Sequence, residues 1–599
     1  MSADLDPGQF DLYARELSYL RERGAEFSAA YPKVAARLGI AGRQFADPHV
    51  ERLIESFAFL TARLQHQLEQ DLPELTTGLL GVLHPEQTSP IPAMAIAGFT
   101  VDLAESTLTS GATIDAGTTL FAEVAGRTCW FETAYPVTLW PIALTGAAFV
   151  PWDDLGLPES AVPRQGGAGH RPAGAIRLRL ASGVPLPTLG ARRLRFYIHG
   201  DAIESARLYD LLFERERRVV VRGDDGAAVT AQIRAVGLAP DEGVLPTPTH
   251  AHPGHRLVQE YFVFPRKFMF FDVEVPALPG RNKADILILL DRRPGNVSVR
   301  DESFRLGCTP IINLFSRTTE PIRVDRRRHE YRLSGDARRE RFTEIHSIEE
   351  VTSTGPGEPV QRPYAPFFSF AHKGPSEADP RVFWYARRVP TGRVDLPGSD
   401  VHLSFVDLDL DPEAPPSEVV YARVRCTNRG LADEIDAESP LMLEQAAPVS
   451  AVTCLTKPTS QIEPPLGGQA LWRLVSSLSL NHLSIGGERG ADALRELLRG
   501  HLFTSARAAE KQIDAITAVE SRTVSRRFGR GFGRGTEVTL TLAEGELGDQ
   551  SPILFADVLC RFLSLYAHLN SFTALVLRST TREEVWKQWP PMAGAKPLL

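Results

Sequence analysis

The first ninety residues carry apolar positions at helical spacing. In the first run these positions are three or four residues apart with charged residues between them, and they are Phe10, Tyr13, Leu17 and Leu20. A second run follows the i, i+3, i+4, i+7 spacing of an amphipathic helix, and its apolar residues are Val50, Leu53, Ile54, Phe57, Leu60, Leu64 and Leu68. The pattern therefore predicts two helices, each with one apolar face.

Turn-forming residues mark the ends of the second helix. Asp47 is a good N-cap and Pro48 suits the first helical position, while Pro73 ends the helix at Leu72. Such a helix would be about 37 Å long at about 1.5 Å per residue, and a short third helix is predicted over residues 75–83. The apolar face either packs within its own domain or joins a bundle with another protein, and the pattern leaves both open.

From about residue 93 the periodicity changes to that of strands. Apolar residues alternate with arginine or tyrosine over residues 176–180 and 194–198, which is typical of strands with one buried face. Further strands are predicted at 261–264, 268–275, 286–290, 401–410 and 419–426. Connections rich in proline, glycine and aspartate, typical of loops, lie near 153–174, 238–256, 354–380 and 411–417.

The last part of the chain mixes both patterns. Helices are predicted at residues 491–503 and 553–569, and a strand at 537–542 follows a glycine-rich turn. This order predicts a multidomain α+β protein and not a single doubly wound sheet. The predicted parts are an N-terminal helical region (1–92), a β-rich domain (93–250), a second β-rich domain (251–440) and a mixed α/β C-terminal domain (441–599).

Composition narrows the class of protein. The 599 residues are 43% hydrophobic and 23% charged, as in ordinary globular domains, and a formal net charge of −8 argues against an obligate nucleic-acid binder. Five cysteines without a paired spacing indicate a reducing compartment. The N-terminal residues lack the basic and apolar regions of a signal peptide, and no apolar run is long enough to span a bilayer. We therefore expect a soluble, cytoplasmic protein.

Three histidines form the sharpest metal-like cluster. His250, His252 and His255 lie within six residues, and imidazole is a common ligand of zinc and nickel. However, the segment is a Pro/Gly-rich loop without a carboxylate or thiolate at a fixed spacing to complete the shell. We favour a solvated loop and keep a metal-dependent enzyme as the alternative.

Residues 526–535, RRFGRGFGRG, resemble arginine-glycine-aromatic tracts that bind single-stranded nucleic acid by charge and stacking. The tract lacks the ending and the strand–helix context of a phosphate-binding loop. Because alternating apolar residues follow it, we favour a mobile connection entering a strand.

A second arginine-rich stretch covers residues 323–341 and is interleaved with acidic residues. Mixed signs favour a solvated or partner-facing surface over a phosphate-binding track. The chain contains many Asp and Glu residues, but the sequence alone does not identify any two of them as a catalytic pair. The sequence contains no usable catalytic or nucleotide-binding motif, so we expect no enzymatic activity, no cofactor, no metal and no small-molecule substrate.

Several longer strings resemble the TssF family, also called ImpG or VasA, of the bacterial type VI secretion system. Two lie near the N-terminus, LYARELSYLRERGAEFSAAYPKVAARLGI (12–40) and ADPHVERLIESFAFLTARLQHQLEQDLPELTTGLLGVLHPEQTSPIPAM (46–94). Others follow in order: LRFYIHG (194–200), LYDLL (208–212), EYFVFPRKFMFFD (260–272), CTPIINLFSRTTEPI (308–322), CTNRG (426–430), LWRLVSSLSLNHLS (471–484) and LNSFTAL (569–575). The matches are colinear over nearly the whole chain, and the tract at 526–535 departs from the family pattern.

The resemblance implies a structural subunit of a baseplate, with a fold similar to the wedge proteins of contractile-phage baseplates. Members of the family occur as two TssF copies with one TssG in a wedge, beside TssE and the adaptor TssK, and six wedges surround the VgrG spike hub. The ring docks at the inner membrane, through the membrane complex, and starts assembly of tube and sheath. Nucleic acid is not an expected partner.

We expect the two N-terminal apolar faces to contact such partners, because a helix bundle shared with a partner would bury apolar side chains that are otherwise exposed to water. The candidate interface residues are Phe10, Tyr13, Leu17, Leu20, Val50, Leu53, Phe57 and Leu64.

Overall fold

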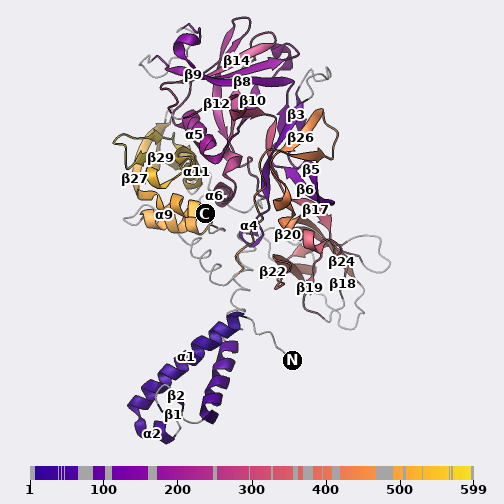
Figure 1. Ribbon diagram of the computed structural model, residues 1–599, viewed down its shortest axis with the longest axis vertical. Coiled ribbons are helices and arrows are strands. Elements are labelled where there is room, and N and C mark those ends of the chain that lie inside the picture. Colours follow the sequence, from indigo (N-terminus) through magenta and orange to yellow (C-terminus); the bar gives the residue numbers. More distant parts are fainter. Residues whose placement is uncertain are drawn as a thin grey trace. The chain divides into compact units, whose positions relative to one another are not determined.

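The fold is taken from a computed structural model in which contacts between residues divide the chain into two units (Figure 1). One unit comprises Met1–Val82 and Pro465–Val475, and the other comprises Leu83–Pro464 and Ser476–Leu599. The structure describes residues 7–37, 40–41, 44–45, 48–64, 85–101, 111–158, 171–246, 253–295, 297–324, 328–354, 362–367, 382–393, 395–407, 418–466, 490–502, 507–528, 531–565, 567 and 571–594.

The first unit is helical, as the apolar spacing predicts. It contains α1 (Pro7–Ala30), α2 (Pro32–Arg37), the short antiparallel pair β1 (Ile40–Ala41) and β2 (Gln44–Phe45), and a helix over residues 48–64. Both predicted amphipathic helices are therefore confirmed, the second as far as residue 64. Its predicted continuation to residue 72 and the predicted helix at 75–83 lie outside the described residues.

An antiparallel sheet of eight strands forms one end of the second unit (Figure 1). Its strands, in spatial order, are β15 (Phe304–Leu306), β10 (Arg193–Ile198), β13 (Phe270–Glu274), β12 (Ala228–Val236), β11 (Val219–Gly223), β14 (Lys283–Leu290), β9 (Gly174–Ser182) and β8 (Ile142–Pro151). The alternation predicted a buried face on β9 and β10, and the structure confirms it: Ile176, Leu178 and Phe196 are buried, whereas Arg179 is exposed.

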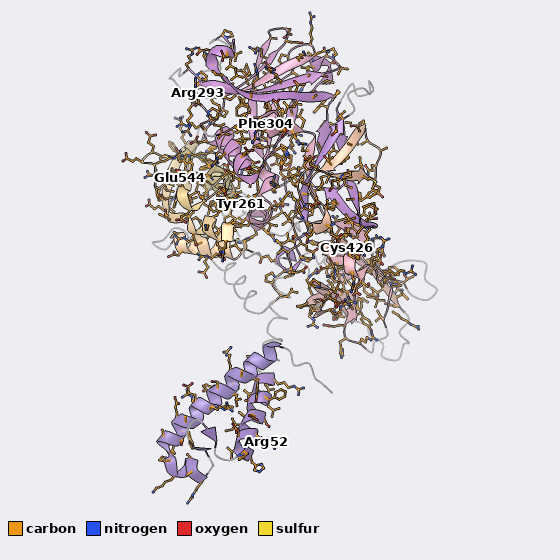
Figure 2. The ribbon with its side chains drawn as sticks, viewed as in Figure 1. Arg52, Tyr261, Arg293, Phe304, Cys426 and Glu544 are labelled. Atoms are coloured by element: carbon orange, nitrogen blue, oxygen red, sulfur yellow. The ribbon has the colours of Figure 1, made fainter. Side chains whose placement is uncertain are left out.

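Three helices share the hydrophobic core of this sheet: α5 (Ala202–Phe213), α6 (Pro253–Val263) and α11 (Pro552–Ser564). Helix α11 packs on both α5 and α6, and Tyr261 and Phe304 are labelled within this core in Figure 2. The predicted strand at 261–264 is wrong, because these residues end a helix whose buried side chains Leu257, Val258 and Tyr261 follow helical spacing.

A closed barrel draws its strands from distant parts of the sequence. In order around the barrel these are β16 (Cys308–Ile312), β3 (Met94–Val101), β26 (Val449–Cys454), β25 (Ser439–Leu443), β5 (Thr119–Val124) and β6 (Arg127–Thr133). Strand β26 pairs directly with β3 although hundreds of residues separate them. The division at residues 92, 250 and 440 stays a prediction.

A third sheet follows the barrel. Its main path is β17 (Phe315–Thr318), β24 (Val419–Thr427), β20 (Glu344–Thr354), β21 (Arg362–Pro366), β22 (Val382–Pro390), β23 (Ser399–Asp407) and β19 (Tyr331–Arg332), while β18 (Ile322–Arg323) also pairs with β24. The predicted strands at 401–410 and 419–426 are confirmed over the described residues. Asn428 connects this sheet to the barrel, because its backbone N–H donates to Asn313 Oδ1 (2.7 Å) and its Oδ1 accepts from the Trp130 backbone N–H (2.8 Å).

The C-terminal sheet contains a β–α–β crossover. Strands β28 (Gly531–Leu542) and β29 (Phe572–Ser579) are parallel, and α11 connects them, as parallel pairs require. The remaining elements are β27 (Ile516–Phe528), β30 (Lys587–Gln588), β31 (Met592–Ala593), α9 (Gly490–Arg499) and α10 (Arg507–Asp514). The mixed α+β, multidomain prediction is confirmed.

A buried ion pair fixes the loop between β12 and α6. Glu260 is fully buried and pairs with Lys267, which is 1% exposed. Glu260 also accepts from the backbone N–H groups of Val244 (2.7 Å) and Leu245 (2.8 Å), and Lys267 Nζ donates to the Glu242 carbonyl (3.0 Å). The carboxylate and the ammonium group therefore give hydrogen-bond partners to the backbone groups that the loop buries in the core.

A half-buried aspartate lies at the N-terminus of α11. Asp210 of α5 accepts from Ser551 Oγ (2.5 Å) and from the Ile553 backbone N–H (3.3 Å). Burial nevertheless raises the pKa of Asp210 from 3.8 to about 7. Its charged form is therefore costly in the folded chain near neutral pH.

We expect Lys267→Met to lower the free energy of unfolding of the second unit by about 3–5 kcal/mol, because it leaves Glu260 buried without its cation. Urea denaturation followed by tryptophan fluorescence would measure the change. The exposed Lys283 is the matched control, and Lys283→Met should change stability by less than about 0.5 kcal/mol. Adding Glu260→Gln to Lys267→Met should recover part of the lost stability. If Lys267→Met and Lys283→Met are equally stable, the ion pair does not stabilise the second unit.

Asp210 should make stability depend on pH. Between about pH 4 and pH 7 the folded chain holds a proton on this carboxyl that the unfolded chain has lost, so stability falls as pH rises and levels off above pH 7. Its contribution is at most about 1.4 kcal/mol per pH unit. Urea denaturation at pH 5, 6, 7 and 8 would measure this. The free energy of unfolding should change less with pH for Asp210→Asn than for the unchanged chain. Parallel slopes would count against this assignment.

Candidate interaction surfaces

The helix over residues 48–64 presents an apolar stripe to solvent. Leu53, Phe57, Leu60 and Leu64 are 71%, 59%, 55% and 61% exposed, respectively. Their spacing of four, three and four residues places them on one face of the helix. We call these four residues the N-terminal stripe.

Other faces of the same helix make contacts within the unit. The Tyr13 and Phe59 rings meet edge to face with centroids 6.4 Å apart, and Arg21 Nη2 lies 3.2 Å from Glu51 Oε1. Ala58 and Ala62 are fully buried. The helix is therefore held against α1 by one side and leaves its largest apolar side chains uncovered within the described chain.

The eight predicted interface residues do not share one environment. Tyr13, Leu17, Leu20 and Val50 are half-buried, Leu53, Phe57 and Leu64 are exposed, and the side chain of Phe10 lies outside the described residues. As contacts with a partner, all eight stay a prediction. Leu60 was part of the apolar pattern but not of the predicted interface, although its position three residues after Phe57 assigns it to the same stripe.

The histidine cluster is split by the start of a helix. His255 belongs to α6 and is buried, with its Nδ1 2.7 Å from Nε2 of His501. The rings stack with centroids 5.0 Å apart, and Leu497 O is 2.9 Å from Nδ1 of His501. The prediction of a solvated loop is wrong for His255, while His250 and His252 lie outside the described residues.

Within the described part of the chain, no three His, Cys, Asp or Glu side chains are grouped so that they could hold a metal ion. The helices described here include none that is both long and apolar enough to cross a membrane.

The arginine-glycine tract forms the end of an antiparallel hairpin. The described residues 526–528 and 531–535 belong to β27 and β28, which pair up to Phe528 and Gly531. The predicted mobile connection is therefore wrong at these positions. One of its charges is paired within the sheet, because Arg526 shares the Glu537 carboxylate with Arg522, which precedes the tract, whereas Phe532 is 80% exposed.

Two of the described arginines in the stretch at 323–341, Arg332 and Arg341, form ion pairs. Arg332 contacts both Glu340 and Asp400, and Arg393 lies 2.7 Å from Glu340. These two guanidinium groups lower the pKa of Glu340 to about 2. Arg338 and Arg339 are exposed, so the stretch combines ion pairs with solvated arginines, and its role as a surface that faces a partner stays a prediction.

Comparisons with known proteins give one consistent family. The family model "Type VI secretion system, TssF" matches residues 5–596. The type VI secretion system component TssF1 of Pseudomonas aeruginosa is 34% identical over 632 aligned residues, which cover 99% of this chain and all of the relative.

Solved structures agree with the family match. A cryo-electron microscopy structure of the type VI secretion system TssK-TssF-TssG baseplate subcomplex contains a chain with 26% identity and a TM-score of 0.72, covering 90% of this chain and 99% of that one. A baseplate complex from the type VI secretion system contains a chain with 24% identity and a TM-score of 0.61, covering 98% of this chain and all of that one, and supports the fold alone.

Proposed function

Because this chain belongs to the TssF family of the type VI secretion system, we propose that it is a structural subunit of the baseplate wedge that assembles with TssG and TssK. The observation that carries this proposal is the similarity to a chain of the TssK-TssF-TssG subcomplex, which extends over 90% of the sequence. A subunit of this kind acts by holding other proteins in position and transforms no substrate.

In this proposal the chain works as one of two TssF copies that share a TssG, next to TssE, around the VgrG spike hub. The wedges act in the cytoplasm, dock at the inner membrane through the membrane complex and start tube and sheath assembly. Two identical chains in one wedge must make unlike contacts, and a chain built of two compact units suits that demand.

The N-terminal stripe supports the proposed contact with TssG. Its four side chains have more than half of their surface uncovered in the chain alone, and fully burying a large apolar side chain contributes about 1.5–3 kcal/mol. A helix of TssG laid along this face would cover the stripe by helix–helix packing. The stripe thus offers the first unit an assembly surface that the described residues leave uncovered.

Co-expression with TssG and TssK, followed by size-exclusion chromatography, tests the proposed assembly. The three proteins should elute together. A chain that stays alone at every concentration, and whose deletion leaves sheath assembly intact in cells, would contradict it.

We expect Phe57→Asp to leave the chain folded, because this side chain is 59% exposed, and to weaken binding to TssG at least about tenfold, which is about 1.4 kcal/mol. A carboxylate placed in a packed apolar seam has no partner there. Affinity measurements with purified TssG, together with circular dichroism, would separate binding from folding.

The control for Phe57→Asp is Arg52→Asp, which changes an exposed residue of the same helix outside the stripe (Figure 2). This variant should bind TssG within about twofold of the unchanged chain, as expected for a substitution outside the interface core. Equal binding by both variants would show that the stripe is not the contact surface.

A further inference from the structure

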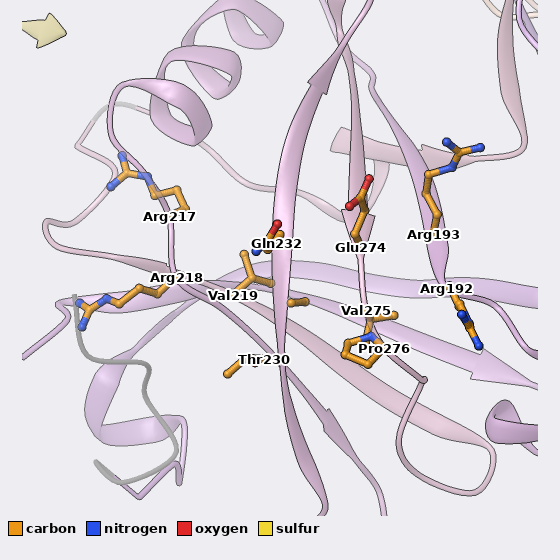
Figure 3. Close-up of a pocket in the computed structure, with 11 residues that line it drawn as sticks. Arg192, Arg193, Arg217, Arg218, Val219, Thr230, Gln232, Glu274, Val275 and Pro276 are labelled. Carbon is orange, nitrogen blue, oxygen red and sulfur yellow. The ribbon is translucent and has the colours of Figure 1, made fainter. Parts of the chain in front are cut away.

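A basic pocket of about 780 Å³ lies in the eight-stranded sheet of the second unit (Figure 3). Arg217 and Arg218 lie to one side of Gln232, and Arg192 and Arg193 lie to the other. The volume is within the range of known ligand sites, about 300–1,000 Å³. The four arginines make the lining of this pocket positively charged.

The pocket arises where strand β12 changes its hydrogen-bonded neighbour. Its first half, up to Ala231, pairs with β11, and its second half, from Gln232 onward, pairs with β13. Arg217 and Arg218 precede β11, while Arg192 and Arg193 lie at the start of β10, the strand beyond β13. The topology thus brings two arginine pairs to a gap that no strand of the described sheet fills.

The cations on the β11 side exceed the acidic charge available to them. Arg217 and Arg218 share the single carboxylate of Asp291, at 3.8 Å and 3.3 Å. The Arg217 side chain is only 3% exposed, and its Nε and Nη2 already donate to the Leu211 carbonyl (3.0 Å and 2.7 Å). Arg218 is therefore the cation of this pair that a ligand can contact, and the buried charge of Arg217 adds to the positive potential beside it.

The cations on the β13 side are equally undercompensated. Arg193 is 56% exposed and lies 4.0 Å from Asp272, but that buried carboxylate is already held by Arg195 at 2.7 Å and Arg234 at 3.1 Å. Arg192 is exposed and makes no ion pair with the described residues. Both guanidinium groups are therefore accessible to a ligand.

A carboxylate at the centre of the pocket limits which anionic ligands can bind there. Glu274 pairs in register with both Gln232 and Arg193, and it is exposed between the two arginine pairs. Its carboxylate would repel a compact polyphosphate. The lining contains no aromatic side chain on which a nucleotide base would stack.

An extended peptide avoids this repulsion. It presents carboxylates at separate positions along its length, and its neutral backbone carries N–H groups between them. The exposed side chains of Thr230 and Gln232 add uncharged hydrogen-bonding groups at the same place.

We propose that this pocket binds an extended acidic segment of a partner protein, with carboxylates at Arg218 on one side and at Arg192 and Arg193 on the other, and peptide backbone across Gln232 and Glu274. The site belongs to the second unit and does not involve the N-terminal stripe. Loss of acidic-peptide binding and loss of TssG binding can therefore be told apart.

The test uses a fluorescent ten-residue peptide of alternating Asp and Thr, a matched peptide of Asn and Thr, and anisotropy measurements with the full chain. The Asp peptide should bind saturably and the Asn peptide should not. Arg192→Glu combined with Arg193→Glu should weaken binding at least tenfold, and the charge-neutral Arg192→Gln with Arg193→Gln should weaken it less.

The matched control changes Arg338 and Arg339 to glutamate. These are two consecutive exposed arginines in the segment between β19 and β20. This double variant carries the same change in net charge and should bind the Asp peptide within about twofold of the unchanged chain. Equal loss in both glutamate pairs, or equal binding of both peptides, would overturn the proposal. Displacement of the Asp peptide by ATP or inorganic phosphate at lower concentration would also overturn it and identify a phosphate site.

Discussion

The ion pair between Glu260 and Lys267 is the constraint around which the second unit is built. Charges are buried without a large penalty only when every polar atom around them has a partner, and here the partners are the backbone groups of the loop that connects β12 to α6. The same loop accepts a hydrogen bond from the hydroxyl of Tyr135 at the Glu242 carbonyl (2.8 Å). One buried pair therefore ties a helix, a loop and the segment that follows the barrel strand β6 into one core.

Polar contacts of the same kind connect the other parts of this unit. Asn313 and Asn428 hold the barrel to the third sheet, and Asp557 of α11 accepts from Tyr209 of α5 (3.0 Å) and from Trp589 beside β30 (2.5 Å). These side chains are buried and satisfied, so each fixes one relative position of two elements. Several of them fall in the strings that resemble the TssF family, such as CTPIINLFSRTTEPI and CTNRG. The strings thus mark places where distant segments meet.

Much of the secondary structure could be predicted because its periodicity is local. The alternation in β9 and β10 and the helical spacing of α1 need no tertiary information. The strand prediction at 261–264 is wrong because four apolar residues fit a strand and a helix end equally well. The apolar pattern does not predict α5, although Asp201 caps this helix by accepting from the Glu204 backbone N–H. The basic pocket could not be predicted, since its arginines come together only through the order of strands in the sheet. The same holds for the exposure of the N-terminal stripe, which depends on the face that α1 covers.

The barrel has a consequence for how the chain folds during synthesis. Strand β3 needs β16 on one edge and β26 on the other, and β26 emerges from the ribosome roughly 350 residues later, which is about 20–70 s at 5–20 residues per second. During this interval one edge of an apolar strand has no neighbour, and such edges promote aggregation. Nascent chains of this protein are therefore expected to be natural clients of ribosome-bound chaperones until the barrel closes.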